Sequence, residues 1–460
     1  MQTPRLVIAG NASGAGKTTV AIGLIAALRA RGLRVQPFKC GPDYMDPAYL
    51  SLAAGQACRS VDSWLIGRQA MLSVMARACT GADVAIVEGI MGLYDGRSGL
   101  GAEGTTAEVA KWLRAPVLLV LDVGRTAQSA GAIALGFHEF DHDVQIVGVV
   151  LNNIADPAHL GRATEAVEAG AGLPVLGHLA RNQAITLPER HPCLLAAGER
   201  DDLPARIDRI QHEVEASVDV DALLQAACAA WPLPVGANPG PFPPSPRPPR
   251  IRLGVAQDEA FDLYQPGNLD LLTAWGAELV PTSPLRDAAL PPGLDGLYFG
   301  PGFPELHAAE LAANESYLRS VREVTEAGLP VYAECGGLIY LCQGLTGVGG
   351  RHALAGVVPA WAKMGERGVH VGYALAVTAQ DTLIAKRGKR LRGYEFYWAR
   401  VALPAEQAAY RVLDPEDRLE GYARAGILAS HLRLHFASDA ALVRSIIDVC
   451  ARRAEARARP

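Results

Sequence analysis

The amino-acid sequence predicts an α/β protein with two parallel-sheet domains. Short apolar runs rich in β-branched residues alternate with longer alanine-rich amphipathic stretches, which is the pattern of parallel α/β sheets. The segment "PLPVGANPGPFPPSPRPPR" at 232–250 interrupts this pattern. Proline removes backbone donors and favours extended geometry, so the segment is predicted to be a semi-rigid linker. The expected domains are therefore residues 1–231 and 251–460.

The apolar runs are expected to form the strands of both sheets. They are "RLVIAG", "DVAIVEG", "APVLLVLDV", "QIVGVVLNN" and "LPVLGHL" before the linker, and "RLGVAQD", "AELVPT", "LDGLYFG" and "LPVYAE" after it. Nearly every run ends in a polar or glycine-rich cluster. Ligands of open parallel sheets bind beyond the carboxyl ends of the strands, so we expect the chemistry at these clusters.

Composition indicates a globular protein and excludes several classes. Half of the 460 residues are hydrophobic and 20% are charged, which is enough for large cores. The amino terminus lacks a signal-peptide pattern and no apolar run reaches about 18 residues, so we expect a cytoplasmic protein without membrane contact. Eight cysteines without a CxxC pair indicate reduced thiols, and a net charge of -5 gives no basic field for nucleic acid.

The stretch "NASGAGKTTV" at 11–20 follows a predicted strand and opens a helix-like run. Gly14 and Gly16 let backbone N–H groups surround phosphate, Lys17 reaches the outer phosphates, and Thr18 offers a hydroxyl to magnesium. Asn11 stands where the phosphate-binding motif has its first glycine. A glycine-rich turn that only caps a helix is the alternative, but the strand-loop-helix context favours a nucleotide site.

Acidic residues follow two later strand-like segments. Asp43 and Asp46 lie in "FKCGPDYMDPAYL", and "VEGIMGLYDG" places Glu88 at a strand end and Asp95 seven residues later. A hard cation that bridges ATP phosphates needs a few carboxylates besides the P-loop hydroxyl. Thr18, Asp43 and Glu88 are therefore the predicted metal ligands, although either acid alone would be interpreted as a turn or capping residue.

The stretch "VYAECGGLIYL" at 331–341 predicts a nucleophile elbow, with Cys335 between a strand and a helix. A helix N-terminus lowers the pKa of a thiol, so we expect a reactive sulfur there. The alternative of a buried structural cysteine suits Cys342 better. Upstream, "YFGPGFPE" at 298–305 is a tight turn around Gly302, and such a turn can aim backbone N–H groups at an oxyanion.

A base for the thiol is expected in "LASHLRLHFAS", which contains His431 and His435. If this segment is extended, both histidines and Arg433 project from one face, because side chains alternate along a strand. The residues alone do not decide between the two histidines.

Together these motifs resemble the cobyrinic acid a,c-diamide synthase family over essentially the whole chain. They are the P-loop, "GPDYMDP", "VEGIMGLYDG", "GVVLNN", "LPERH", "GPGFPE" and "YAECGGLIYL", in that order. The resemblance implies a dethiobiotin-synthetase-like P-loop domain followed by a flavodoxin-like class I glutamine amidotransferase domain without the usual triad acid. It implies ATP- and glutamine-dependent amidation of the a and c acetate side chains of a corrin precursor, in cobalamin biosynthesis.

The resemblance also implies roles for individual residues. Cys335 attacks glutamine, and Asn152 contacts the adenine. The residues implied to bind ATP and Mg²⁺ are Gly14, Gly16, Lys17, Thr18 and Thr19. Those implied to line the amidation site are Asp43, Asp46, Glu88 and Asp95. The expected partners are a corrin or related tetrapyrrole and L-glutamine, and a homodimer is compatible with this reading.

Several positions depart from the family pattern. Leu50, Tyr394 and Tyr397 stand where relatives usually have histidine, and "SHLRLHF" replaces a signature close to "SYLHLHF". Arg433 thus takes the place of the first histidine, and arginine stays protonated. We therefore prefer His435 over His431 as the base, because it retains a histidine of the signature. A sirohaem-type or nickel tetrapyrrole as substrate, and a P-loop regulatory ATPase, are the alternative functions.

Overall fold

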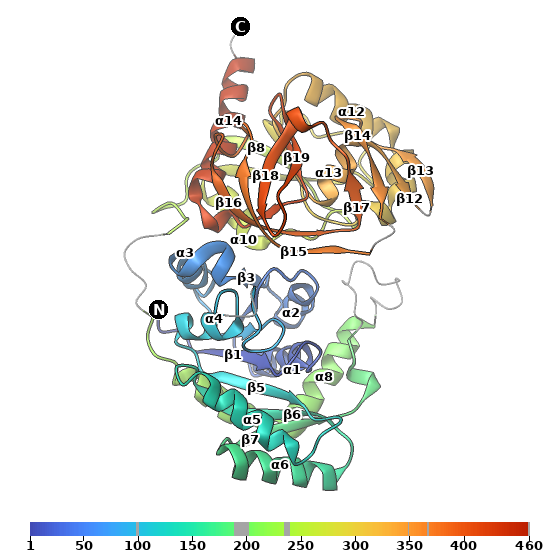
Figure 1. Ribbon diagram of the computed structural model, residues 1–460. Coiled ribbons are helices and arrows are strands. Elements are labelled where there is room, and N and C mark those ends of the chain that lie inside the picture. Colours follow the sequence, from blue (N-terminus) through green and yellow to red (C-terminus); the bar gives the residue numbers. More distant parts are fainter. Residues whose placement is uncertain (98–100, 188–201, 234–239, 348, 366–367, 459–460) are drawn as a thin grey trace. The chain divides into compact units, whose positions relative to one another are not determined.

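The computed structural model describes residues 1–97, 101–187, 202–233, 240–347, 349–365 and 368–458. The chain divides into two compact units, Met1–Asn238 and Pro239–Pro460 (Figure 1). Part of the expected linker, residues 234–239, and most of the "LPERH" motif lie outside the described residues. Within the described ranges, no helix is long and apolar enough to cross a membrane.

The first unit contains a seven-stranded, all-parallel sheet in the order β3-β2-β4-β1-β5-β6-β7. The strands are β1 (Arg5–Gly10), β2 (Val35–Cys40), β3 (Arg59–Val61), β4 (Val84–Glu88), β5 (Val117–Asp122), β6 (Ile146–Ile154) and β7 (Val175–Ala180). All five strands expected before the linker are confirmed. Strands β2 and β3 are additional, because β2 carries Gln36, Pro37 and Lys39 and lacks a continuous apolar run.

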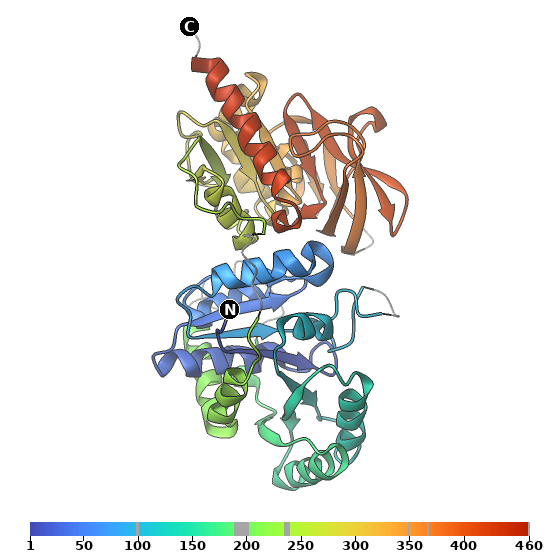
Figure 2. The same ribbon diagram turned by 90° about the vertical axis from the view of Figure 1, so that its left-hand side faces the viewer.

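Helices flank this sheet (Figures 1 and 2). They are α1 (Lys17–Ala30), α2 (Asp46–Ala54), α3 (Ser63–Ala78), α4 (Thr106–Leu113), α5 (Ser129–Phe140), α6 (Pro157–Ala171), η1 (Gln183–Ile185), α8 (Leu203–Ser217) and α9 (Val220–Cys228). One core cluster joins α1, α2, α8 and α9 to the sheet. Helix α1 packs closely on α8, because a Cβ at Gly23 would collide with Val214. The N-terminus of α1 lies at the carboxyl edge of the sheet, because only residues 11–16 separate it from the end of β1.

The second unit contains a ten-stranded mixed sheet and a four-stranded sheet. Its parallel part has the order β9-β8-β10-β11-β20 and continues through antiparallel strands to β21. The parallel part consists of β8 (Ile251–Ala256), β9 (Ala277–Thr282), β10 (Gly296–Phe299), β11 (Val331–Glu334) and β20 (Ile427–Ser430). The antiparallel strands of this sheet are β15 (His370–Thr378), β16 (Arg390–Tyr397), β18 (Ala408–Asp414), β19 (Arg418–Arg424) and β21 (Arg433–Leu434).

The four strands expected after the linker are confirmed as β8 to β11, and the predicted α/β fold class is confirmed for the whole chain. The four-stranded sheet consists of β12 (Cys342–Gly347), β13 (Gly350–Ala353), β14 (Val358–Met364) and β17 (Ala399–Val401). The helices are η3 (Pro304–Leu306), α10 (Pro266–Ala274), α11 (Ala308–Ala313), α12 (Glu315–Glu326), α13 (Gly336–Leu341), η4 (Ala405–Gln407), η5 (Phe436–Ser438) and α14 (Ala440–Ala458). The antiparallel strands were not predicted, because their buried residues alternate with partly or fully exposed ones.

Candidate functional site

The P-loop joins β1 to α1 and is held by side chains of neighbouring strands. Gly16 has a φ of 98°, and a Cβ there would collide with the side-chain amide of Asn152. That amide donates to the carbonyl of Ala15 at 2.9 Å. Asn11 accepts a hydrogen bond from the N–H of Asp122 at 3.1 Å through Oδ1. The residue in place of the first glycine therefore anchors the loop to β5.

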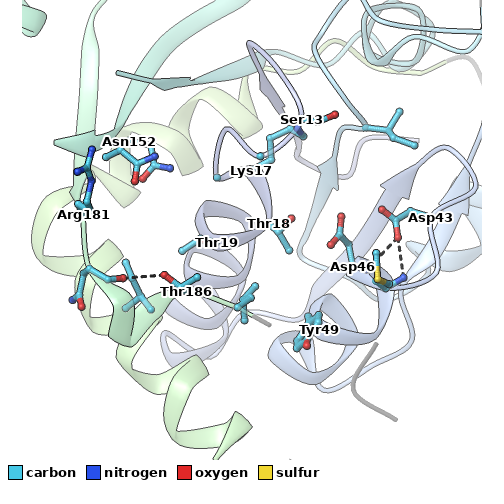
Figure 3. Close-up of a pocket in the computed structure, with 18 of the residues that line it drawn as sticks. Ser13, Lys17, Thr18, Thr19, Asp43, Asp46, Tyr49, Asn152, Arg181 and Thr186 are labelled. Carbon is cyan, nitrogen blue, oxygen red and sulfur yellow. Dashed lines mark hydrogen bonds between the residues drawn. The ribbon is translucent and has the colours of Figure 1, made fainter. Parts of the chain in front are cut away.

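The P-loop opens into a cavity of about 680 Å³ within the first unit (Figure 3). Its size lies in the range of small-molecule and cofactor sites, about 300–1,000 Å³. The predicted residues that line it are Gly14, Gly16, Lys17, Thr18, Thr19, Asp43, Asp46 and Asn152. Asn152 and Arg181 lie on one side of the P-loop residues, and Asp43 and Asp46 on the other (Figure 3). The cavity thus has an amide-lined end and an acidic end.

Lys39 joins the acidic residues of this cavity and was not predicted from the sequence. It lies at the carboxyl end of β2 and is almost completely buried. Its Nζ lies 2.9 Å from Oε1 of Glu88, 2.5 Å from Oδ2 of Asp46 and 3.7 Å from Oδ2 of Asp43. Burial opposes the charged amine, but these three carboxylates raise the pKa of Lys39 well above its ordinary value. A lysine within a buried strand was the only sequence signal for it.

The oxygen of Glu88 that contacts Lys39, Oε1, also contacts Thr18 of the P-loop. The hydroxyl of Thr18 donates to Oε1 of Glu88 at 2.6 Å, and burial raises the pKa of this carboxyl to about 7 although Lys39 opposes the shift. The other oxygen, Oε2, is buried without a hydrogen-bond partner among the described residues. A hydroxyl beside a carboxylate oxygen that lacks a partner fits a hard cation.

The described residues hold no group of three or more His, Cys, Asp or Glu side chains that could bind a metal ion. Mg²⁺ commonly binds through one or two protein ligands together with substrate phosphates, so Thr18 and Glu88 are sufficient on the protein side. Asp43 accepts from the N–H of Met45 at 2.8 Å through Oδ1 and faces Nζ of Lys39 with Oδ2, and its role as a metal ligand stays a prediction. Asp95 accepts from the N–H of Gly92 at 2.9 Å and does not line the cavity.

In the second unit, Cys335 occupies a sharp turn between β11 and α13. Its φ of 51° and ψ of -107° are strained for a residue with a Cβ. The backbone N–H of Cys335 donates to the carbonyl of Ser430 at 2.7 Å, and Sγ donates to the carbonyl of Phe396 at 2.9 Å. The predicted elbow is therefore present as backbone geometry, with the thiol directed at β16.

The glycine turn around Gly302 packs directly against this elbow. A Cβ at Gly336 would lie 2.7 Å from the carbonyl oxygen of Gly302, and a Cβ at Gly302 itself would collide with the backbone of Ala260. The N–H of Gly300 donates to the hydroxyl of Tyr264 at 2.8 Å. Only glycine fits at 300, 302 and 336. Because these residues have no side chains, the turn packs directly against Gly336, the residue after Cys335.

The thiol of Cys335 does not have the expected low pKa. Burial raises its pKa to about 12, and the nearby positive charge of Arg433 opposes this shift. The expectation of a lowered pKa is therefore wrong for the protein without substrate. The physical reason is burial: neither the charge of Arg433 nor the hydrogen bond from the N–H of Gly336 offsets the desolvation of a thiolate.

The three candidate side chains of the C-terminal motif have different surroundings. The chain leaves β20 at Ser430 and re-enters a strand at Arg433, so the segment is not one extended strand. The guanidinium of Arg433 donates to the carbonyl of Leu263 at 2.8 Å. His435 accepts a hydrogen bond from the N–H of Ala437 at 3.3 Å through Nδ1.

His431, the third of these side chains, stacks on Tyr397 with ring centroids 4.0 Å apart. Burial and the positive charge of Arg418 lower the pKa of His431 to about 3. The ring is therefore neutral at physiological pH and a weak base.

Comparison with known proteins relates both units to described families. The CobQ/CobB/MinD/ParA nucleotide binding domain matches residues 6–194, and the CobB/CobQ-like glutamine amidotransferase domain matches residues 252–441. The chain is 40% identical to the cobyrinate a,c-diamide synthase of Dehalococcoides mccartyi, with 98% of each chain covered. It is 42% identical to the hydrogenobyrinate a,c-diamide synthase of Streptomyces coelicolor, with 97% of each covered. The cobyrinate a,c-diamide synthase of Methanosarcina acetivorans is 40% identical over 89% of this chain and 86% of its own.

Proposed function

Because the chain belongs to the family of cobyrinate and hydrogenobyrinate a,c-diamide synthases, we propose that it is an ATP- and glutamine-dependent amidoligase. Its substrate is a corrin precursor, cobyrinate or hydrogenobyrinate, in cobalamin biosynthesis. The reaction converts the a and c acetate carboxylates to amides. The enzyme is a ligase, since it couples formation of a carbon–nitrogen bond to cleavage of ATP.

The first half-reaction activates the carboxylate. A carboxylate oxygen attacks the γ-phosphorus of ATP, the bond from that phosphorus to the β-phosphate oxygen breaks, and ADP leaves. The resulting acyl phosphate has a good leaving group. Ammonia then attacks the acyl carbon, phosphate departs, and a proton is lost to give the amide.

The acidic end of the P-loop cavity is suited to this step. Lys17 and the loop glycines bind the phosphates, and we assign the adenine to the opposite end of the cavity, where Asn152 and Arg181 lie. Lys39 balances the charges of Glu88 and Asp46, which lets carboxylate groups of enzyme and substrate approach one another. Thr18 and Glu88 would hold Mg²⁺, which would supply neutralisation of phosphate charge.

The second half-reaction releases ammonia from glutamine. Cys335 attacks the amide carbon to form a thioester, and we assign the oxyanion to backbone N–H groups of the Gly302 turn. We assign proton transfer to His435 and not to His431. A general base works best with a pKa near the operating pH, and the pKa of His431 is about 3. As Cys335 attacks, Nε2 of His435 takes the proton of the thiol and then donates it to the departing ammonia. This requires the tautomer with a proton on Nδ1, so the hydrogen bond that Nδ1 accepts from the N–H of Ala437 must open in this step.

The observation that supports this function best is the strained elbow at Cys335 in a chain that also has a P-loop cavity with a buried lysine–carboxylate cluster. A regulatory ATPase would need only the second feature. The test is to incubate the purified protein with ATP, glutamine and cobyrinic acid, hydrogenobyrinic acid or sirohydrochlorin derivatives, and to identify products by mass. We expect a doubly amidated corrin and ADP. ATP hydrolysis without ammonia release or an amidated product would favour the regulatory ATPase.

A further inference from the structure

One buried side chain holds the main chain of His435 from both sides. The carbonyl of Leu434, the residue before it, accepts a hydrogen bond from Nδ2 of Asn268 at 2.8 Å. The N–H of Phe436, the residue after it, donates to Oδ1 of the same asparagine at 2.8 Å. An asparagine amide offers a donor and an acceptor side by side on one short planar group, so it satisfies both peptide groups. Asn268 thus pairs with the segment around His435 as a neighbouring strand would.

Asn268 is itself fixed in the first turn of α10. It is only 2% exposed, and its backbone N–H donates to the carbonyl of Gln265 at 2.9 Å. A Cβ at the preceding residue, Gly267, would lie 3.9 Å from Cε1 of His435. The first turn of α10 therefore lies against both the main chain and the imidazole ring of His435.

A second anchor joins the same segment to the strand that carries the thiol. Oε1 of Glu334, the residue before Cys335, accepts from the N–H of Leu434 at 2.9 Å. The hydroxyl of Tyr332 donates to the same oxygen at 2.7 Å, and that of Tyr298 donates to Oε2 at 2.8 Å. The buried carboxylate is thus held at both oxygens. It connects the main chain next to the base with the residue next to the nucleophile.

We propose that Asn268 is a positioning residue of the glutaminase reaction, because its amide holds the main chain of His435 in place relative to Cys335. The hydrogen bond between the ring of His435 and the N–H of Ala437 has to open during proton transfer. The contacts of Asn268 are to main-chain groups, so they persist while the ring moves. In this role Asn268 acts through His435 and does not contact glutamine. The inference rests on the proposed glutaminase reaction and adds a residue that determines its rate.

The test is steady-state kinetics of ammonia release by full-length Asn268→Ser protein, since serine is too short to reach both peptide groups. We expect kcat to fall about 10- to 100-fold, because a small displacement of a catalytic group costs that much, and the KM for glutamine to stay close to that of the parent. Ammonia-dependent amidation should be unchanged. In a His435→Ala background, the same substitution should leave the residual kcat unchanged, because its effect requires the ring.

Asn314→Ser is the matched control. The amide of Asn314 also joins separate segments of the second unit, since it donates to the carbonyls of Pro284 and Asp287 at 2.9 Å each. Its loss should disturb the packing of this unit to a similar extent without touching the segment around His435. The control should keep the kcat of the parent, which separates a positioning role from a general loss of structure.

A second variant and a second measurement complete the test. If Asn268→Ser does not fold, Asn268→Asp keeps the acceptor for Phe436, loses the donor for Leu434, and should lower kcat in the same way. Hydrogen exchange of residues 431–437 should be faster in either variant, because one anchor is lost. The positioning role alone is overturned if kcat stays at the parent level, or if it falls equally with and without His435. A native chain that releases no ammonia would overturn the glutaminase reaction, and this role with it.

Discussion

Nζ of Lys39 lies 2.9 Å from Oε1 of Glu88, in an ion pair that is almost completely buried, and the hydroxyl of Thr18 donates to the same oxygen at 2.6 Å. One carboxylate oxygen thus contacts both the P-loop and the lysine of β2. Glu88 therefore links Thr18 of the P-loop to Lys39 at the acidic end of the cavity. Substitutions of either residue should affect the same step, the activation of the substrate carboxylate.

Replacing the buried lysine should destabilise the first unit. Lys39→Met leaves the buried Glu88 and the partly exposed Asp46 without their cation, and a buried pair that loses one partner costs about 3–5 kcal/mol. Urea unfolding followed by circular dichroism measures this. The control is Lys386→Met, because Lys386 is 89% exposed in its ion pair and should change stability by no more than about 0.5 kcal/mol. Equal stability of both variants would contradict the assigned ion-pair network.

Removing the thiol should separate the two half-reactions. Cys335→Ala is expected to abolish amidation with glutamine and to retain most amidation with added ammonia, because the synthetase site needs only the nitrogen. Product formation with each donor, followed by mass, measures this. Cys342→Ala is the matched control, since Cys342 is buried near the same helix with Sγ bonded to the carbonyl of Leu338. Equal loss with both donors in Cys335→Ala would remove the nucleophile assignment.

Changes on the nucleotide side should affect both nitrogen donors alike. Lys17→Ala and Glu88→Ala are each expected to eliminate amidation with glutamine and with ammonia, because no acyl phosphate can form. Formation of ADP that depends on the tetrapyrrole should be lost in parallel. If either variant keeps near-native turnover with ammonia, that residue does not take part in activating the carboxylate.

The pKa of Cys335 predicts how its alkylation depends on pH. With a pKa of about 12, the thiolate fraction rises tenfold for each pH unit below that value. The rate of alkylation by iodoacetamide should therefore increase about 100-fold from pH 7 to 9, without a plateau. In the urea-unfolded chain the same thiol should level off above about pH 8.5. Peptide mass spectrometry resolves this site from the others, and a plateau below pH 8 in the native protein would refute the raised pKa.

The two histidines should give different kinetic results. His435→Ala is expected to lower the glutaminase kcat by about 10²- to 10⁴-fold, the usual contribution of general acid–base catalysis, and to spare ammonia-dependent amidation. His431→Phe keeps the ring that stacks on Tyr397 and should leave the glutaminase kcat close to that of the parent, because His431 is a weak base. Normal turnover by His435→Ala, beside a low kcat for His431→Phe, would reverse these roles.

The motifs that depend on neighbours in the chain were predictable. A strand that ends in glycines before a helix determines the P-loop at Lys17 and the elbow at Cys335 through local backbone geometry, so their residues could be named in advance. The continuous apolar strands were predicted for the same reason, because their residues are buried on both faces of a sheet. The antiparallel strands of the second unit alternate in burial and gave no such run.

Other features were decided by the tertiary structure. Lys39 gains its role from Glu88, which is 49 residues away, and nothing near it in the chain indicates that contact. The high pKa of Cys335 arises from burial by distant segments, and a cavity of the second unit joins Leu338 of α13 to Glu420 of β19, 82 residues further on. A sequence specifies its local backbone through nearby side chains. Desolvation and charge pairing depend on which distant residues the fold brings together, so electrostatics and cavities are properties of the folded chain.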